Sequence, residues 1–159
     1  MRKLFILLIF ILVYISCDKN EYNSPVLVYS MKSDVPEIYL LNNKNEDVIV
    51  NFAYSYRKSD SLINLDFKYL KEKDILVMGL DTLNKIESVF KPKNMEFNMY
   101  QSNRNKDEVR TYVFNKEFGL FASLGFKSHQ LFLKDSVNSL EKENIFKGLF
   151  IELNKTFIK

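Results

Sequence analysis

One thiol and one imidazole are present in the chain, Cys17 and His129, so each reactive group can be considered by itself. A serine hydrolase would need His129 beside a nucleophile on a tight turn such as G-x-S-x-G. The segment 119–125 reads GLFASLG, in which Ser123 has the wrong spacing from the glycines. Structural zinc sites and multi-histidine sites need several Cys or His ligands, which this composition excludes. We therefore predict that His129 is a turn residue next to Ser128.

Carboxylates are a second source of chemistry, because a glycosidase needs only two of them at a suitable separation. Asp60, Asp66, Asp74 and Asp81 are close in the sequence, but Asp66 falls on the polar side of a predicted strand and Asp74 in a charged turn. These four aspartates are better explained as solvated surface residues than as a catalytic pair. The four glycines form no phosphate-binding motif, and the segment 103–107 lacks the glycine and terminal Glu of a calcium loop. We expect no enzymatic activity, no metal site and no cofactor.

Aromatic residues are abundant, with nine Tyr and fourteen Phe but no Trp. Most of them alternate along predicted strands, where core packing is their ordinary role. Four tyrosines are the candidates for ligand contact: Tyr54, Tyr56, Tyr69 and Tyr112, the last on a strand face that also carries Arg110. If they line the concave side of a curved sheet, they would form a pocket for an apolar or sugar-like ligand.

The N-terminal segment has the order of features that is typical of a signal peptide. Arg2 and Lys3 precede twelve apolar residues at 4–15, and Ser16 follows directly before Cys17. This apolar run is shorter than the roughly twenty residues that a helix needs to cross a bilayer. We therefore predict a cleaved leader at 1–16 rather than a membrane-spanning helix.

The end of this leader resembles that of bacterial lipoprotein precursors, in which a small residue stands directly before a cysteine that becomes the lipidated first residue of the mature protein. Ser16 and Cys17 match that pattern, whereas Tyr14 stands where the family usually carries Leu. The resemblance covers only the leader and implies that Cys17 is the lipidation site. Each buried methylene of an acyl chain contributes about 0.8 kcal/mol, so two or three long chains would hold the protein at a membrane permanently. The alternative is an ordinary secretory leader that leaves Cys17 as a free thiol.

Three segments follow from these boundaries: a signal peptide at 1–16, a lipidated N-terminus and tether at 17–25, and one globular domain at 26–159. The composition, 47% hydrophobic and 27% charged, suits a single packed core. Removing Arg2 and Lys3 with the leader leaves 21 basic and 20 acidic residues, a net charge of +1. Like charges form no long block, so we expect no nucleic-acid partner.

Alternation of large and polar residues predicts that the domain is mostly β-sheet. The segment 48–57 is the clearest strand, because five large side chains fall on one side of it. Other apolar or alternating runs, the candidates for the remaining strands, lie at 26–31, 38–41, 63–69, 75–80, 95–99, 109–114, 118–124 and 130–134. Short connections between consecutive strands favour an antiparallel meander.

One helix is predicted at the C-terminus. Its apolar face comprises residues spaced i, i+3, i+4, i+7 and i+11: Phe146, Leu149, Phe150, Leu153 and Phe157. We expect Ser139 to cap its start and the segment 81–90 to form a helical turn before Pro92. The predicted fold class is α+β, mostly β: a meander of seven or eight strands, curved or half-barrel, with the helix buried in its concave side. Some envelope lipoproteins that carry lipids have similar half-barrels, an analogy of architecture alone.

Together these features predict a lipid-anchored bacterial cell-envelope protein whose β-rich domain is a non-enzymatic binding or assembly module, with the outer membrane favoured over the inner. The expected partners are the membrane, through the N-terminal acyl chains, and another envelope protein. Two alternatives remain: a carrier of a small ligand or lipid inside a curved sheet, and an immunity-type lipoprotein that neutralises a toxin. An envelope hydrolase ranks last.

Overall fold

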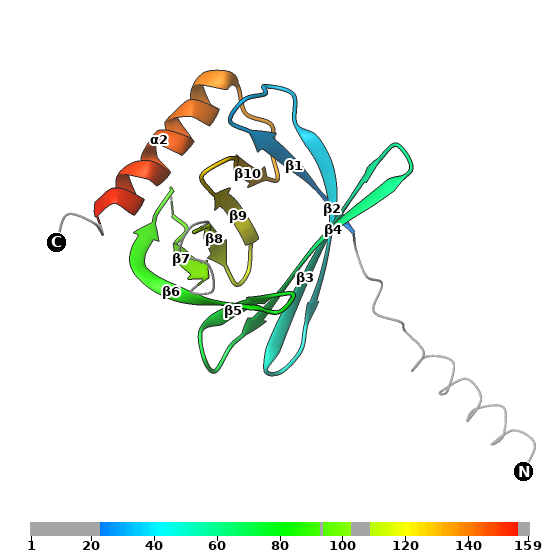
Figure 1. Cartoon of the computed structure of the whole chain (residues 1–159), viewed down its shortest axis with the longest axis vertical. Helices are drawn as coiled ribbons and strands as arrows, with labels where there is room; N and C mark the ends of the chain where they lie inside the picture. The colour runs from blue at the N-terminus through cyan, green and yellow to red at the C-terminus, as the bar shows by residue number, and fades with distance from the viewer. Residues whose placement is uncertain (1–22, 93, 103–108, 156–159) are drawn as a thin grey trace, which may run out of the picture.

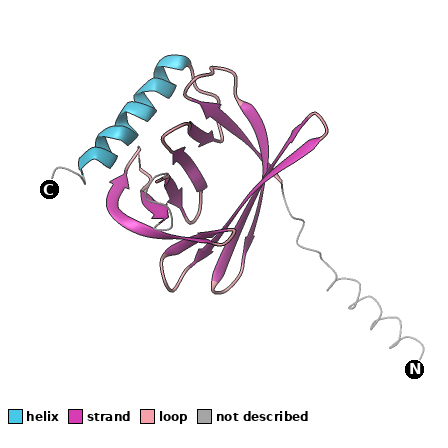
Figure 2. Cartoon of the chain, in the orientation of Figure 1, coloured by secondary structure: helices cyan, strands magenta, loops and turns pink. Residues whose placement is uncertain are grey.

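A computed structural model describes residues 23–92, 94–102 and 109–155, which contain ten β-strands and one α-helix. The strands are β1 (Ser24–Ser30), β2 (Glu37–Asn45), β3 (Ile49–Lys58), β4 (Ser61–Leu70), β5 (Ile75–Met78), β6 (Asp81–Phe90), β7 (Phe97–Ser102), β8 (Thr111–Asn115), β9 (Gly119–Leu124) and β10 (His129–Leu133), and the helix is α2 (Ser139–Lys155). This content confirms the predicted class, mostly β with a C-terminal helix (Figure 2). Across the described residues no helix is long and apolar enough to cross a membrane.

The ten strands form a closed antiparallel barrel in which each strand pairs with its neighbours in the chain (Figure 1). The predicted meander is therefore confirmed, although it has more strands than the seven or eight expected. Closure comes from β1, which pairs with β2 on one side and with β10 on the other. In that closing pair Leu27 lies opposite Leu133, and Tyr29 lies opposite Leu131.

The barrel interior is filled by side chains from all ten strands, two or three from each of β1 to β4 and β8 and one from each of the others. We call these the interior cluster: Val26, Val28, Tyr39, Leu41, Val50, Phe52, Tyr54, Phe67, Tyr69, Leu76, Leu83, Tyr100, Tyr112, Phe114, Leu120 and Phe132. Rings from strands that do not pair with each other meet inside the barrel. The ring centroids of Phe52 and Phe114 are 5.2 Å apart, and those of Phe67 and Tyr112 are 5.3 Å apart. Edge-to-face contacts of this kind are favourable and leave little space between the walls.

A second cluster covers the outside of the barrel wall and packs it against α2. This outer cluster comprises Tyr29, Phe97, Met99, Val113, Phe121, Ala122, Leu124, Leu131, Leu133, Phe146 and Leu149. The helix therefore lies on the convex side of the sheet, and the prediction that it fills the concave side was wrong. The interior cluster already fills the closed barrel, so the apolar face of α2 is buried on the outside.

The segment 81–90 is a strand, and the prediction of a helical turn there was also wrong. This strand, β6, pairs with β5 on one side and β7 on the other. Leu83 belongs to the interior cluster, whereas Ile86 packs with the outer cluster. The Ser88 hydroxyl donates to the backbone carbonyl of Glu152 in α2 at 3.3 Å. Both faces of β6 are thus covered, so its apolar residues do not simply alternate with polar ones.

The cap of α2 is Asn138 and not Ser139, which corrects the predicted cap by one residue. The Asn138 side-chain Oδ1 accepts a hydrogen bond from the Glu141 backbone N–H at 2.9 Å. Its carbonyl accepts another from the Lys142 N–H at 2.9 Å. These two bonds satisfy backbone donors that the first turn of a helix leaves without partners.

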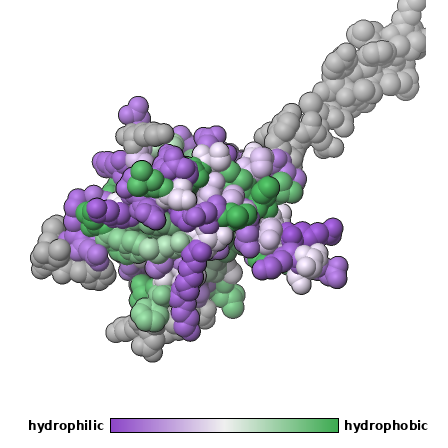
Figure 3. Space-filling view, turned by 90° about the horizontal axis from the view of Figure 1, so that it is seen from above, coloured by the Kyte–Doolittle hydropathy of each residue, from purple (hydrophilic) through white to green (hydrophobic). Residues whose placement is uncertain are grey.

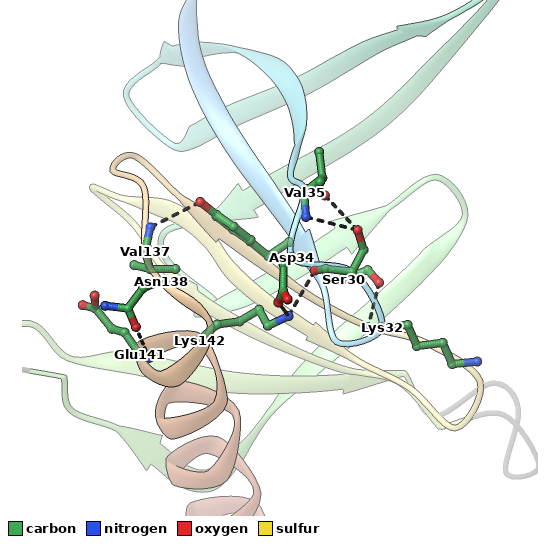
Figure 4. A network of polar contacts seen from close by, with 10 residues as sticks. Ser30, Lys32, Asp34, Val35, Val137, Asn138, Glu141 and Lys142 are labelled. Carbon is green, nitrogen blue, oxygen red and sulfur yellow. Dashed lines mark hydrogen bonds and ion pairs between the residues drawn. The ribbon is translucent and has the colours of Figure 1, made fainter.

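Lys142 fastens the start of α2 to the loop between β1 and β2 (Figure 4). Its side chain is 6% exposed, and its Nζ lies 2.6 Å from Asp34 Oδ1 and 3.1 Å from the Ser33 carbonyl. The hydrogen bond from Lys142 is the main reason why the pKa of Asp34 lies below its ordinary value. Close by, the Val137 N–H donates to the Tyr29 hydroxyl at 3.2 Å. This corner joins the C-terminal helix to both strands that begin the barrel.

Candidate functional site

Asp74, in the turn between β4 and β5, interacts with three side chains from the neighbouring strands. Its Oδ1 accepts hydrogen bonds from the Tyr69 hydroxyl at 3.0 Å and the Tyr100 hydroxyl at 2.7 Å. Its Oδ2 lies 2.8 Å from Lys85 Nζ in β6. We call these four residues the Asp74 cluster. They join β4, β6 and β7, so the cluster ties together strands on both sides of β5.

Within the Asp74 cluster the pKa values are shifted so that Asp74 stays ionised and Tyr69 and Tyr100 stay protonated. Burial acts to raise the pKa of Asp74, but the hydrogen bonds from Lys85, Tyr100 and Tyr69 outweigh it and hold that pKa below its ordinary value. Burial and the bond to the Asp74 carboxylate raise the pKa of Tyr69 to about 12 and raise that of Tyr100 as well. Proton transfer near neutral pH needs groups whose pKa is near 7. The pKa of Asp74 is shifted away from that value in one direction, and the pKa values of Tyr69 and Tyr100 in the other.

The four candidate tyrosines all point to the barrel interior, and the structure gives each a packing partner. Tyr112 is 5% exposed and its ring contacts that of Phe67, while Tyr69 belongs to the Asp74 cluster. Tyr56, nearest the surface, stacks on Tyr39 with ring centroids 4.9 Å apart.

Tyr54 is the most constrained of the four. It is 1% exposed, and its hydroxyl accepts a hydrogen bond from the Leu120 N–H at 2.7 Å. Burial raises its pKa. A Cβ atom at Gly119 would lie 2.5 Å from this hydroxyl, and the φ of Gly119 is +92°, so glycine is required for the close approach.

His129 and Ser123 lie on opposite faces of the sheet and form no nucleophile and base pair, because His129 pairs with Leu124 of the outer cluster and Ser123 pairs with Tyr112 of the interior cluster. The Ser123 hydroxyl instead accepts a hydrogen bond from the Arg110 guanidinium at 2.8 Å, and the same guanidinium donates to the Ser128 hydroxyl at 2.9 Å. The His129 ring packs against Phe150 of α2, and burial, together with the charge of Arg110, lowers its pKa. Among the described residues no group of His, Cys, Asp and Glu is arranged to hold a metal.

The other carboxylates of the sequence cluster are dispersed. Asp60 and Asp66 are exposed, and Asp81 is half-buried at the start of β6. Asp74 was predicted to be a solvated surface residue, but it is half-buried and accepts three side-chain hydrogen bonds. The Tyr69–Asp74 pair is local, but nothing in the sequence joins Tyr100 to Asp74, because intervening strands bring them together.

Two of the recesses on the outside of the described barrel are lined by strand residues. The β2–β4 groove has a volume of about 960 Å³ and is lined by residues that include Val35, Ile38, Leu40, Arg57 and Leu62. In the view from above, apolar side chains interrupt the hydrophilic surface on the side of the molecule that carries β2–β4 (Figure 3). Single exposed apolar residues are common, whereas a contiguous group indicates an interaction surface.

The second recess, the α2 crevice, lies between the helix and the outer wall of the barrel. It has a volume of about 430 Å³ and is lined mainly by apolar side chains, among them Met95, Phe118, Val137 and Ile145. Lys134 lies at this crevice, with its Nζ 4.8 Å from the centre of the Phe118 ring. This volume is within the range of small-molecule sites.

Every strand of the described barrel has a pairing partner on both sides, but the pairing is not complete along each strand. β4 pairs with β5 only over 67–70, so 61–66 has a free edge on that side. Closure leaves only such short stretches for strand addition, so we expect recognition to use mainly side chains on the outer surface. The predicted lipidation site, Cys17, lies outside the described residues. No family model, curated protein or solved structure matches the chain.

Proposed function

We propose that the protein is a lipid-anchored module of the bacterial cell envelope that binds through its outer surface and catalyses no reaction. The anchor is Cys17, at the end of an apolar leader and directly after Ser16. Seven residues further on, Ser24 begins β1, so the tether to the barrel is short. The outer membrane is the favoured location.

One observation supports a binding module over a carrier that uses the barrel interior: side chains from non-neighbouring strands meet inside the barrel. Tyr54 of β3 contacts Phe132 of β10, with ring centroids 5.5 Å apart, and Phe67 of β4 contacts Tyr112 of β8. A ligand would have to separate these packed rings. Binding is therefore assigned to the outside, where the β2–β4 groove presents apolar side chains to solvent.

The test is intact mass and membrane fractionation of the full chain, produced in a bacterium that processes lipoproteins. We expect the wild-type mass to equal residues 17–159 plus acyl chains and the protein to fractionate with membranes. Cys17→Ala should keep its leader or be soluble, because it lacks the acceptor thiol. Asp18→Asn, which leaves Cys17 in place, is the matched control and should be acylated like the wild type.

An unmodified wild type that stays soluble would contradict the proposal. It would indicate instead a secreted domain with a free thiol. If both Cys17→Ala and the wild type are acylated, the acylated residue is not Cys17, and the proposed anchor is wrong.

The α2 crevice favours a second candidate function, carriage of a small apolar ligand. Its lining is mainly apolar, and Phe118 and Ile145 are only half-buried, so part of the apolar surface is accessible. The same purified protein distinguishes the two candidates, since a carrier would retain an apolar molecule that native mass spectrometry detects. A single apo mass favours the binding module.

A further inference from the structure

The outer face of β2, β3 and β4 is divided into an apolar half and a polar half. On the apolar half, Val35, Ile38, Leu40 and Leu62 are 78%, 60%, 46% and 62% exposed. Leu40 pairs with Ser55 and Leu62 pairs with Arg57, which places these residues on adjacent strands. Further along the same strands the outward positions form two rows, Asn42–Ala53–Asp66 and Lys44–Asn51–Lys68, which are polar at every position except Ala53 and form the polar half.

The chain enters the barrel beside the apolar half. Pro25 of β1 pairs with Leu40 of β2, and Leu27 pairs with Ile38. Cys17 is seven residues before Ser24, and an extended chain spans at most about 3.6 Å per residue, so the start of β1 lies within about 25 Å of Cys17. The barrel must therefore stay close to any membrane that holds Cys17.

A cation lies within the apolar half. Arg57 is exposed, and no acidic side chain of the described residues forms an ion pair with it. The stem of an arginine covers apolar surface while its guanidinium reaches outward, and guanidinium groups bind phosphate. Glu37 lines the same groove but is half-buried. Apolar side chains around an unpaired guanidinium match the interface of a bilayer with anionic headgroups.

We propose that the apolar half of the β2–β4 face lies on the bilayer that holds the anchor, with Ile38, Leu40 and Leu62 at the level of the upper acyl chains and Arg57 at the phosphates. This orientation rests on the proposed lipid anchor. It points α2, on the other side of the barrel, away from the membrane (Figure 1). The α2 side would then be the surface open to envelope proteins.

The chain has no tryptophan, so a single introduced Trp reports one position. The reporters are Ile38→Trp and Leu62→Trp, both at exposed positions where a larger side chain has room. The matched control is Asp66→Trp, on the polar half of the same strand as Leu62, and the distant control is Ile151→Trp on α2. Each full chain is purified in its processed form and reconstituted in vesicles of phosphatidylethanolamine with a minority of phosphatidylglycerol.

In vesicles with brominated acyl chains we expect the Trp emission of both reporters to shift to shorter wavelength and to lose most of its intensity. The two controls should keep the emission of a solvent-exposed Trp. Equal, unquenched emission from all four variants would overturn the docking, as would quenching at Ile151→Trp alone. Intact mass of the same samples separates the two proposals. An acylated chain with unquenched reporters refutes only the docking, whereas an unacylated chain refutes the anchor and the docking that rests on it.

Discussion

Asp74 accepts three side-chain hydrogen bonds although its backbone has a left-handed φ of 49°. Aspartate tolerates this conformation better than most residues, which suits it to the turn. Tyr69 and Tyr100 are both buried, and both hydroxyls donate to the Asp74 carboxylate. We infer that the Asp74 cluster stabilises the barrel and has no catalytic role, since its polar groups bond to one another.

Asp74→Asn should lower the free energy of unfolding at pH 7 by about 1 kcal/mol, because the amide keeps an acceptor but loses the ion pair to Lys85, which solvent partly screens. The folded-state pKa of Asp74 lies below its ordinary value of 3.8. The carboxylate therefore contributes stability above that value and loses its contribution as the pH falls through the folded-state pKa. Urea unfolding at neutral and acidic pH should give a difference between wild type and variant that shrinks below about pH 4.

Asp66→Asn is the control, since Asp66 is exposed and lies on the outside of β4, and it should change little at either pH. A difference between wild type and Asp74→Asn that is the same at every pH would contradict the role of the carboxylate.

At the level of elements, periodicity predicts strands well where only one face is buried. The segment 48–57 lies within one residue of β3 because its outward positions are solvated and its inward ones join the interior cluster. In β6 the same rule fails, since α2 covers the outer face of that strand. The contact of Ser88 with Glu152 joins residues 64 apart in the sequence, which no local pattern contains.

The start of α2 provides a test at this scale. Asn138→Ala should destabilise the protein by about 1 kcal/mol, because the Glu141 N–H loses its acceptor. Asn138→Asp keeps a side-chain oxygen there and should retain the wild-type stability. The midpoints of thermal unfolding followed by circular dichroism check both variants. If Asn138→Ala is as stable as the wild type, Asn138 is not the cap.

At the level of the whole molecule, the helix and the barrel share one outer cluster, in which Phe146 and Leu149 of α2 pack with strands β1 and β7 to β10. In a closed barrel every strand has two neighbours, so the loss of one strand exposes an edge of both. The helix and the sheet are therefore expected to unfold together.

Phe146→Ala should cost about 3–5 kcal/mol, because it removes a ring that is 2% exposed and leaves a cavity under α2. Denaturant unfolding followed by far-ultraviolet circular dichroism and by tyrosine fluorescence should give coincident transitions in the wild type. Ile151→Ala, at a position 49% exposed on the same helix, is the control and should shift stability by less than about 0.5 kcal/mol. Separate transitions for helix and barrel would contradict the shared core.

The sequence by itself determined the strands with one solvated face, the order of the meander and the C-terminal helix, because local alternation and a helical apolar face depend only on neighbouring residues. It singled out Tyr54, Tyr69 and Tyr112 as ligand contacts, and the structure places all three in the interior cluster. Only the tertiary structure decided that the barrel closes, that rings fill it and that α2 lies outside. These outcomes depend on which strands meet, such as β1 with β10, and pairing between distant segments leaves no periodic trace in either one.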